Sequence, residues 1–196
     1  KEHGKILPTL IFAPPVVVQN WKKEFLRSSK IKAEKIIPLV GTGKERLKLF
    51  KESPLDSIFI TNYETLQMPE VFEYMKVVLK SGPSCLVVDE SQRVKDITAK
   101  RTKRMIELGD IASYRYILTG TPILNDLMDI YSQFRVLDRG KAFGHNFFTF
   151  RARFFEDKNK SMPANKYFPL WQPIRGADRK IKELIDLSKE EDLGGE

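Results

Sequence analysis

Short apolar runs that each end in a polar cluster recur along this chain, and they constrain its fold more than any other feature. The four strongest runs are residues 10–13, 58–60, 85–88 and 116–118. Runs that are apolar at every position are typical of strands buried on both faces of a parallel sheet. A fifth run, residues 36–40, contains Pro38. Because proline cannot donate a hydrogen bond to a neighbouring strand, this run predicts an edge strand.

Segments with helical spacing of apolar residues separate these runs. Val17, Trp21 and Phe25 recur at that spacing, and residues 47–50, 71–79 and 97–108 also predict helices. Strands that alternate with helices predict an α/β fold with a three-layer parallel sheet. In such sheets ligands bind beyond the carboxyl ends of the strands. The polar clusters that follow the runs are therefore expected to meet at one edge and form the site.

Composition narrows the class of protein. The 196 residues suit one domain, and 41% hydrophobic with 31% charged residues excludes a disordered chain and a membrane protein. One cysteine, Cys85, excludes an internal disulfide and a cysteine-based zinc site, and only two histidines disfavour histidine-centred chemistry. A reducing, intracellular compartment fits this usage. The net charge of +8 favours a polyanionic partner such as nucleic acid, the alternative being a domain with a solvated basic face.

The amino-acid composition changes after residue 139. Residues 140–175 are rich in aromatic and basic residues, and Phe147, Phe150 and Phe154 share one helix face. We expect a helical insertion with its own small core; aromatic stacking on nucleic-acid bases is the alternative. This divides the chain into a core (1–139), the insertion (140–175), and a terminal helix with an acidic, frayed tail (176–196).

The strongest chemical signal is the acid pair Asp89 and Glu90, which ends an apolar run. Two adjacent carboxylates at the end of a buried strand are costly unless a cation or a substrate uses them. The first can hold Mg²⁺ against nucleotide phosphates, and the second can position or deprotonate an attacking water. The alternative is that Asp89 caps the following helix while Glu90 is solvated.

A second signal follows the run at 116–118, where Thr119, Gly120 and Thr121 precede a proline. Small hydroxyl residues and a glycine let the backbone approach a phosphate closely, although they also form ordinary tight turns. The acid pair favours the phosphate-binding interpretation of this loop, because the two loops are expected to be neighbours.

Four segments in order resemble motifs of the Swi/Snf family of superfamily-two DNA translocases. Residues 8–25 resemble motif Ia, 60–66 motif Ib, 89–96 motif II and 118–125 motif III. The resemblance implies the first RecA-like lobe, a P-loop NTPase fold, of a two-lobe ATPase that moves along duplex DNA. The aromatic-rich segment corresponds more loosely to the family's helical protrusion.

The resemblance also implies roles for individual residues. Asp89 would bind Mg²⁺ through water, Glu90 would activate the hydrolytic water, and Thr119 and Thr121 would couple the nucleotide site to DNA. Residues at the DNA backbone would be Pro14, Gln19, Thr61 and Asn62. Implied cofactors and partners are ATP, Mg²⁺, double-stranded DNA, the second RecA-like lobe and chromatin or other DNA-bound proteins, with no membrane. The compartment would be a bacterial or phage-infected cytoplasm, or a nucleus.

The sequence departs from the family pattern in two places. Motif II has Gln92 where the family usually has histidine; glutamine can donate and accept hydrogen bonds but cannot titrate. No P-loop is present, since Gly41–Lys44 is followed by Glu45 where a hydroxyl is required. We interpret this segment as a turn into a helix, and the chain as a fragment of a motor that has no ATPase activity by itself.

A basic cluster follows motif II. It includes Lys95, Lys100, Arg101 and Arg104, and it could track a phosphate backbone. A solvated helix face explains it equally well. The leading hypothesis is an ATP-dependent DNA translocase, and the alternative is a non-catalytic nucleic-acid-binding or scaffold module on a degenerate NTPase fold.

Overall fold

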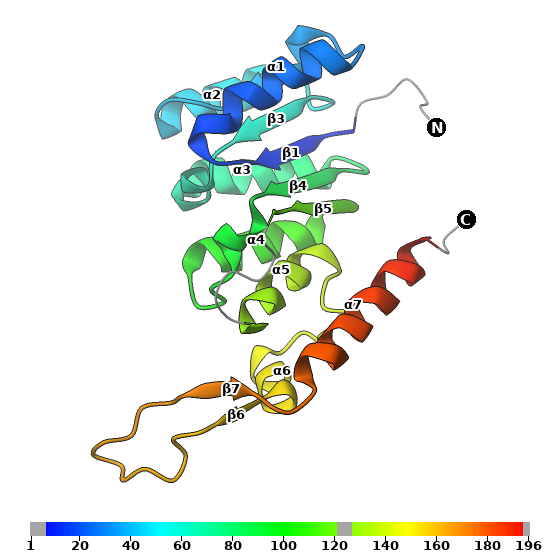
Figure 1. Ribbon diagram of the computed structural model, residues 1–196. Coiled ribbons are helices and arrows are strands. Elements are labelled where there is room, and N and C mark those ends of the chain that lie inside the picture. Colours follow the sequence, from blue (N-terminus) through cyan, green and yellow to red (C-terminus); the bar gives the residue numbers. More distant parts are fainter. Residues whose placement is uncertain (1–6, 121–126, 194–196) are drawn as a thin grey trace.

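A five-stranded parallel sheet forms the centre of the protein. The computed structural model describes residues 7–120 and 127–193, with side chains as far as Asp186. The strands are β1 (Thr9–Phe12), β2 (Ile36–Pro38), β3 (Ile58–Thr61), β4 (Cys85–Asp89) and β5 (Tyr114–Leu118). Their order in the sheet is β2-β3-β1-β4-β5, and each neighbouring pair is parallel (Figure 1). The predicted α/β class is confirmed, and the proline-containing strand lies at an edge as predicted.

Helices cover the two faces of the sheet unequally. The helix α1 (Val18–Ser28) packs on one face, where Trp21 and Phe25 meet Ile11 and Ile60. The other face carries α2 (Gly43–Glu52), α3 (Pro69–Lys80), α4 (Lys100–Ile111) and the end of α5 (Ile130–Leu137). Short 3₁₀ turns connect these elements at Pro15–Val17, Ala33–Lys35, Tyr63–Gln67, Ser91–Val94 and Leu127–Asp129. The result is the predicted three-layer arrangement.

Local chemistry explains where two of the helices begin. Before α2, the Thr42 hydroxyl accepts from the Glu45 N–H and the Glu45 carboxylate accepts from the Thr42 N–H, which is a capping box. The segment 41–45 is therefore the turn that the sequence predicted. Helix α4 begins at Lys100, three residues later than predicted. Asp96 accepts hydrogen bonds from both the N–H and the hydroxyl of Thr98, and this turn competes with the helix.

The strand β5 corrects one expectation. Its residues alternate between exposed and half-buried instead of being buried on both faces, and Tyr114 and Tyr116 are 53% and 56% exposed. The half-buried Ile117 faces the main core, while the exposed side chains share a face with Val87 of β4. Among the described residues, the cluster under α1 includes side chains of β1, β2 and β3 and Val87 of β4, and none of β5.

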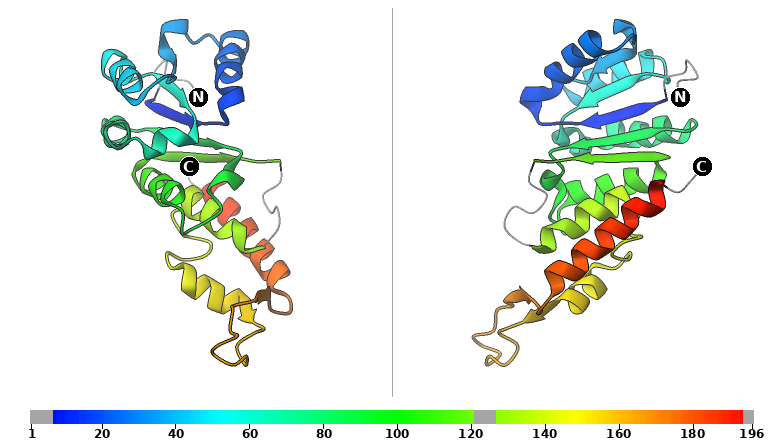
Figure 2. Two further views of the ribbon diagram at one scale, coloured as in Figure 1. Left: turned by 90° about the vertical axis from the view of Figure 1, so that its left-hand side faces the viewer. Right: turned by 45° about the vertical axis from the view of Figure 1, so that its right-hand side comes forward.

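The aromatic-rich segment forms a second core. It contains α6 (Phe147–Phe154), the antiparallel strands β6 (Phe155–Asp157) and β7 (Trp171–Pro173), and then α7 (Ala177–Leu193). Phe150 and Phe154 are buried with Tyr131 and Phe134 of α5, so these rings serve packing, as predicted. A hairpin replaces the expected helix in the second half of the segment and projects from the body of the molecule (Figures 1 and 2). Helix α7 continues to Leu193, further than the predicted fraying allowed.

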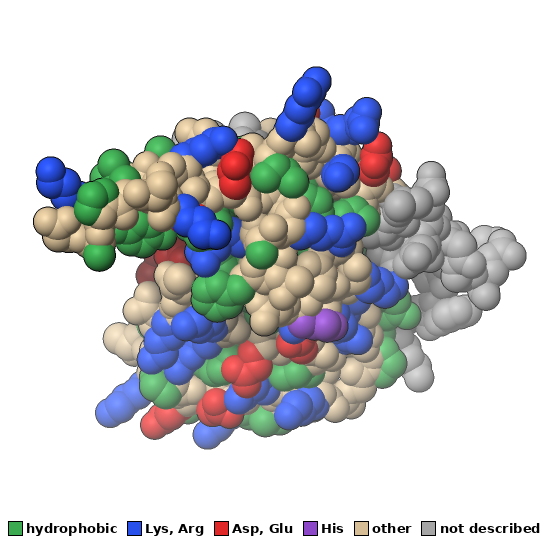
Figure 3. Space-filling view, turned by 90° about the horizontal axis from the view of Figure 1, so that it is seen from below, with side chains coloured by type: hydrophobic (Ala, Val, Ile, Leu, Met, Phe, Trp, Pro, Cys, Tyr) green, Lys and Arg blue, Asp and Glu red, His purple; other side chains and the backbone are tan. Residues whose placement is uncertain are grey.

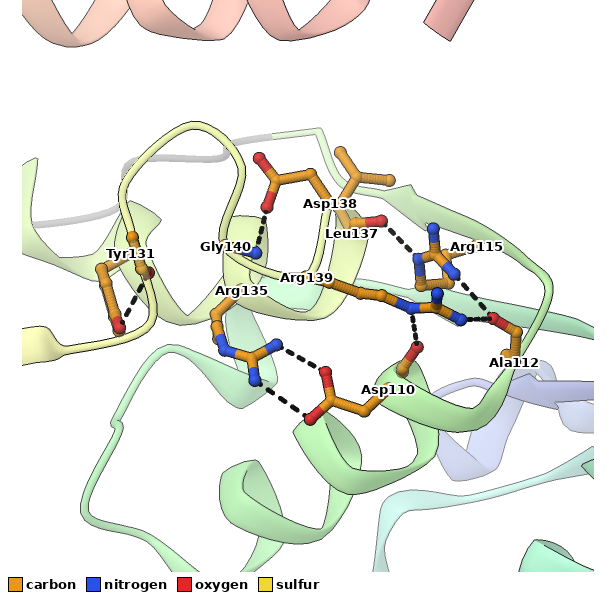
Figure 4. A network of polar contacts seen from close by, with 11 residues as sticks. Asp110, Ala112, Arg115, Tyr131, Arg135, Leu137, Asp138, Arg139 and Gly140 are labelled. Carbon is orange, nitrogen blue, oxygen red and sulfur yellow. Dashed lines mark hydrogen bonds and ion pairs between the residues drawn. The ribbon is translucent and has the colours of Figure 1, made fainter.

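Arginines join the second core to the sheet domain (Figure 4). Arg135 of α5 makes two contacts with Asp110 of α4, at 2.6 and 3.0 Å. Arg115 of β5 donates to the Leu137 carbonyl at 2.6 Å, and Arg139 donates to the Ala112 carbonyl at the same distance. These bonds span 22 to 27 residues of sequence, so they fix the exit from α5 against the end of α4.

Candidate active site

Asp89 is the last residue of β4 and is held by two aromatic side chains. The indole N–H of Trp21 donates to its Oδ2 at 2.8 Å, and the Tyr63 hydroxyl donates to its backbone carbonyl at 2.5 Å. Burial raises the pKa of Tyr63 far above its ordinary value, and the neighbouring Asp89 charge raises it further. Tyr63 is therefore a neutral hydroxyl donor at any physiological pH. Together the two donors fix the position and the side-chain orientation of Asp89.

Glu90 has an unusual backbone conformation. Its φ of 56° and ψ of 55° lie in the left-handed region, which few residues other than glycine adopt. This conformation turns the chain sharply after β4. Backbone strain of this kind clusters at functional sites.

Gln92 connects the two loops that follow β4 and β5. Its amide Nε2 donates to Glu90 Oε2 at 2.6 Å, and its Oε1 accepts from the Thr119 hydroxyl at 2.7 Å. The sequence predicted that these loops are neighbours, and this chain of two hydrogen bonds confirms it. Thr121, the other threonine expected to take part, lies outside the described residues.

Contacts with α5 and with the 3₁₀ turn that precedes it fix the loop after β4. The buried Ser91 hydroxyl donates to Gln133 Oε1 at 2.6 Å, and Lys95 forms an ion pair with Asp129 at 2.8 Å. Lys95, predicted to contact DNA, therefore has a carboxylate partner within the protein. Sequence reasoning missed Trp21, Tyr63 and Gln133 as site residues. Trp21 and Tyr63 carried a signal, because they lie within the segments that resemble motifs Ia and Ib, whereas Gln133 lies in none of the four.

The donor set at Asp89 suits a hydrated magnesium ion. No cluster of three or more acidic, cysteine or histidine side chains capable of holding a metal occurs in the ranges 7–120 and 127–186. Magnesium does not need such a cluster, since it is commonly held by one or two carboxylates together with substrate phosphates. Asp89, with Glu90 as its neighbour, fits that mode.

The residues predicted to touch DNA along the strand ends differ in accessibility. Gln19 is exposed and Asn62 is half-buried, whereas Pro14 and Thr61 are buried. The Thr61 hydroxyl donates to the Leu39 carbonyl and is also contacted by Arg46, so its side chain supports the loop from inside.

Arg46 organises this loop and was not singled out from the sequence. It is only 7% exposed, and it donates to Asn62 Oδ1 at 2.8 Å and to the Gly41 carbonyl at 2.9 Å. It also donates to Thr65. Burial lowers the pKa of Arg46 from its ordinary value, although guanidinium stays charged at physiological pH. Asn62 is thereby held at the carboxyl edge of the sheet.

The basic cluster on α4 divides in the same way. Lys100 is exposed, while Arg104 lies over the Phe72 ring at 4.6 Å and donates to the Leu66 carbonyl. Arg101 is half-buried, and its charge acts on Tyr63 beside the acid pair. The cluster is thus neither wholly a solvated face nor wholly a phosphate-tracking face.

Comparison with known proteins identifies the family. The model of the SNF2-related domain matches residues 1–190. The chain belongs to the SNF2-related family. Its relatives include protein p41 of Acyrthosiphon pisum secondary endosymbiont phage 1, which is 30% identical over 156 residues, covering 76% of this chain and 33% of the phage protein. Chicken DNA repair and recombination protein RAD54B is 32% identical over 135 residues, covering 67% of this chain and 13% of that protein.

Solved structures agree with this assignment. The SWI2/SNF2 ATPase core domain of Sulfolobus solfataricus matches with a TM-score of 0.61 and 26% identity, covering 92% of this chain and 32% of that chain. The same core in complex with double-stranded DNA matches in fold with a TM-score of 0.64 at 24% identity, covering 94% of this chain and 33% of the other. The SNF2-related chain thus has the RecA-like ATPase-core fold and spans about a third or less of these relatives. None of its described helices has the length and apolar character needed to cross a bilayer.

Proposed function

We propose that this chain supplies the first lobe of an ATP-dependent motor that moves along double-stranded DNA. The observation that carries the proposal is the hydrogen-bonded series Thr119–Gln92–Glu90 beside a fixed Asp89. Two carboxylates with separate supports allow two separate roles in one site. A fold-level likeness alone would not support a function, but side chains in this arrangement do.

The residues divide the work of hydrolysis as follows. Asp89 would hold a magnesium ion, which would neutralise phosphate charge when nucleotide is bound. Glu90 accepts a proton from the attacking water or orients it. Gln92 fixes the Glu90 carboxylate and transmits its position to Thr119, so that the loop after β5 responds to the state of the nucleotide. The chain by itself has no glycine-rich phosphate cradle in its sequence, and we expect the 196 residues alone to turn over no ATP.

The DNA face of the proposal lies along the same edge of the sheet. Gln19, Asn62 and Lys100 are accessible there and would contact the duplex backbone, with Arg101 beside them. Pro14 and Thr61 are positioning residues that hold the loops carrying these contacts. Lys95 and Arg104 reach phosphate only by exchanging their present partners. The second RecA-like lobe and chromatin or other DNA-bound proteins are the further proposed partners.

The test is the variant Glu90→Gln in the longest natural polypeptide that contains this chain. Removing the proton acceptor is expected to reduce DNA-stimulated ATP hydrolysis by about 10²–10⁴-fold while ATP binding is retained. The matched control is Glu70→Gln, an exposed glutamate in the first turn of α3, which is expected to leave hydrolysis unchanged.

Two outcomes would contradict the proposal. Hydrolysis at the wild-type rate in Glu90→Gln would remove Glu90 from the mechanism. Absence of ATP hydrolysis in the wild-type polypeptide, with DNA binding intact, would favour the non-catalytic nucleic-acid-binding module instead.

A further inference from the structure

The positive charge of this protein is densest in one segment. Residues 141–180 contain nine Lys and Arg against three Asp and Glu, a net charge of +6 out of +8 for the whole chain. The other 156 residues carry 25 Lys and Arg against 23 Asp and Glu. Of these, residues 1–140 carry 23 Lys and Arg against 17 Asp and Glu, a net charge of +6, and residues 181–196 carry two against six, a net charge of −4. The sheet domain, which holds the proposed ATPase site, is therefore basic as well, and the insertion has the higher charge density because its +6 falls on 40 residues.

The hairpin of the insertion presents three of these nine cations, together with two acids, Glu156 and Asp157. We call residues 155–173 the arm: strands β6 and β7 and the connection between them. Every residue from 160 to 170 is exposed, including Lys160 and Lys166, and Lys158 is exposed at the base. Figure 3 shows Lys and Arg side chains along the arm and over the neighbouring surface.

The base of the arm is an ordered structure. Asp157 Oδ1 accepts from the backbone N–H of Asn159 at 3.0 Å and of Leu170 at 2.9 Å, and its other oxygen accepts from the Tyr167 hydroxyl. These bonds lower the pKa of Asp157, with the Tyr167 hydroxyl as the largest cause. The half-buried Asp157 thus accepts hydrogen bonds from within the arm, whereas Lys158, Lys160 and Lys166 are exposed to solvent.

Other cations of the insertion are committed to packing. The Arg151 guanidinium lies over the Trp171 ring at 4.0 Å and near the Phe148 ring at 5.2 Å. Lys158 pairs with Glu156, but both side chains are about half exposed, and such a pair is weak enough to exchange for a phosphate. Lys158, Lys160 and Lys166 are the cations that the arm itself presents, and all three are exposed.

The arm and the proposed ATPase site lie on the same side of the molecule. In Figure 1 the strands β1, β3 and β4 point to the left, and the arm also projects to the left; the first view of Figure 2 shows that side from the front. A DNA duplex bound across the carboxyl edge of the sheet would therefore lie next to the arm.

We propose that the arm is a second DNA-binding element, which holds the phosphate backbone of the duplex through Lys158, Lys160 and Lys166. This inference rests on the proposed function for its choice of duplex DNA. A DNA duplex carries one phosphate charge about every 1.7 Å along its axis, so separate exposed lysines can each form an ion pair with a phosphate, and no shaped pocket is needed. Such contacts position the protein on DNA and carry no sequence preference. An acidic protein partner is the competing occupant.

The experiment measures binding of the 196-residue chain to a fluorescein-labelled duplex by anisotropy from 50 to 200 mM salt. The arm variant is Lys158→Ala, Lys160→Ala and Lys166→Ala combined. The matched control is Lys32→Ala, Lys51→Ala and Lys80→Ala combined, which removes the same charge from exposed lysines at the opposite edge of the sheet, where α2 and α3 end. Each lost phosphate contact reduces the slope of log K against log salt by about 0.9.

The arm variant is expected to have a slope that is shallower by about 2 to 3, with weaker binding at every salt concentration. The control is expected to keep the slope of the wild-type chain. Equal slopes for the two variants would overturn the proposal and leave the arm for an acidic protein partner. Absence of any duplex binding by the wild-type chain would overturn it as well.

A second measurement places the contact directly. A photoreactive phenylalanine analogue at Phe168, whose ring is 58% exposed, is expected to crosslink to duplex DNA, whereas the same analogue at Tyr74 in α3 is not. Failure of the arm proposal is distinguishable from failure of the proposed function. If Glu90→Gln abolishes ATP hydrolysis while the arm variant binds DNA normally, only the arm proposal is wrong.

Discussion

The variant Phe150→Ala tests whether the second core is energetically separate from the sheet. Phe150 is 1% exposed, and its ring lies 5.0 Å from Tyr131, 5.1 Å from Phe143 and 5.2 Å from Phe154. These neighbours belong to α5, the 138–146 segment and α6. None of them belongs to the buried cluster under β1 and β4.

The expected loss follows from this packing. Truncating a fully buried phenylalanine costs about 3–5 kcal/mol, which combines the lost transfer of the ring with the cavity left behind. Domains have about 5–15 kcal/mol of stability in total. A loss of 3–5 kcal/mol confined to the second core makes local opening about 10²–10³-fold more frequent there, because 1.4 kcal/mol corresponds to a factor of ten.

Hydrogen exchange read by peptide mass spectrometry separates the two cores. Faster exchange is expected in α6, the arm and α7, with β1, β3 and β4 unchanged. The control is Phe148→Ala on the same helix, where the ring is 67% exposed and the expected change is below about 0.5 kcal/mol. Equal acceleration in β1 and α6 would show one cooperative unit and refute the argument.

Three further predictions concern single side chains. Replacing Arg46 by Met removes a charged hydrogen-bond donor from Thr61 and Asn62. This variant is expected to lower the free energy of unfolding, measured by urea denaturation, by about 2–4 kcal/mol. The control Lys48→Met, at an exposed lysine, is expected to change it by less than about 0.5 kcal/mol. Burial raises the pKa of the Cys85 thiol to about 11, so a disulfide reagent at pH 8 is expected to react more than about a hundredfold slower than with free cysteine until urea unfolds the chain. The hydrogen bonds of Asp157 hold its pKa below the ordinary value, so arm order is retained above about pH 4 and is lost as the pH falls through the lowered pKa. The protection of the Leu170 amide against exchange, relative to the unfolded chain and followed down the acid range, checks this, and protection that stays constant throughout would contradict it.

Sequence patterns predicted the sheet well because each strand carries its own signal. Apolar runs bounded by polar clusters identified all five strands, and Pro38 identified an edge. Strand β5 was the exception, because its side chains are exposed or half-buried where burial on both faces was predicted. Its sequence alternates tyrosine with arginine and isoleucine from Tyr114, and only the second half looked like a continuous apolar run.

The hairpin of the arm could not be predicted in the same way. Its strands have three residues each and are separated by 13 residues without periodicity. Their pairing depends on the Asp157 hydrogen bonds to positions 167 and 170, which no local pattern indicates. A helix was expected because the aromatic spacing that precedes the hairpin is helical.

The site was predicted in part for a similar reason. The sequence singled out Asp89, Glu90, Gln92 and Thr119 because they stand at the ends of apolar runs, and the folded sheet brings them together. The supports were missed because Trp21 is 68 residues and Tyr63 26 residues from Asp89, and only the folded sheet brings them together.

The two tryptophans of the chain have a practical consequence. Trp21 donates its indole N–H to the carboxylate of the acid pair, and Trp171 lies under the guanidinium of Arg151 at the base of the arm. Indole emission responds to neighbouring charge, so the intrinsic fluorescence of this protein comes from two reporters with separate locations. Trp171→Phe leaves an unlabelled optical signal from the acid pair, and Trp21→Phe leaves one from the arm.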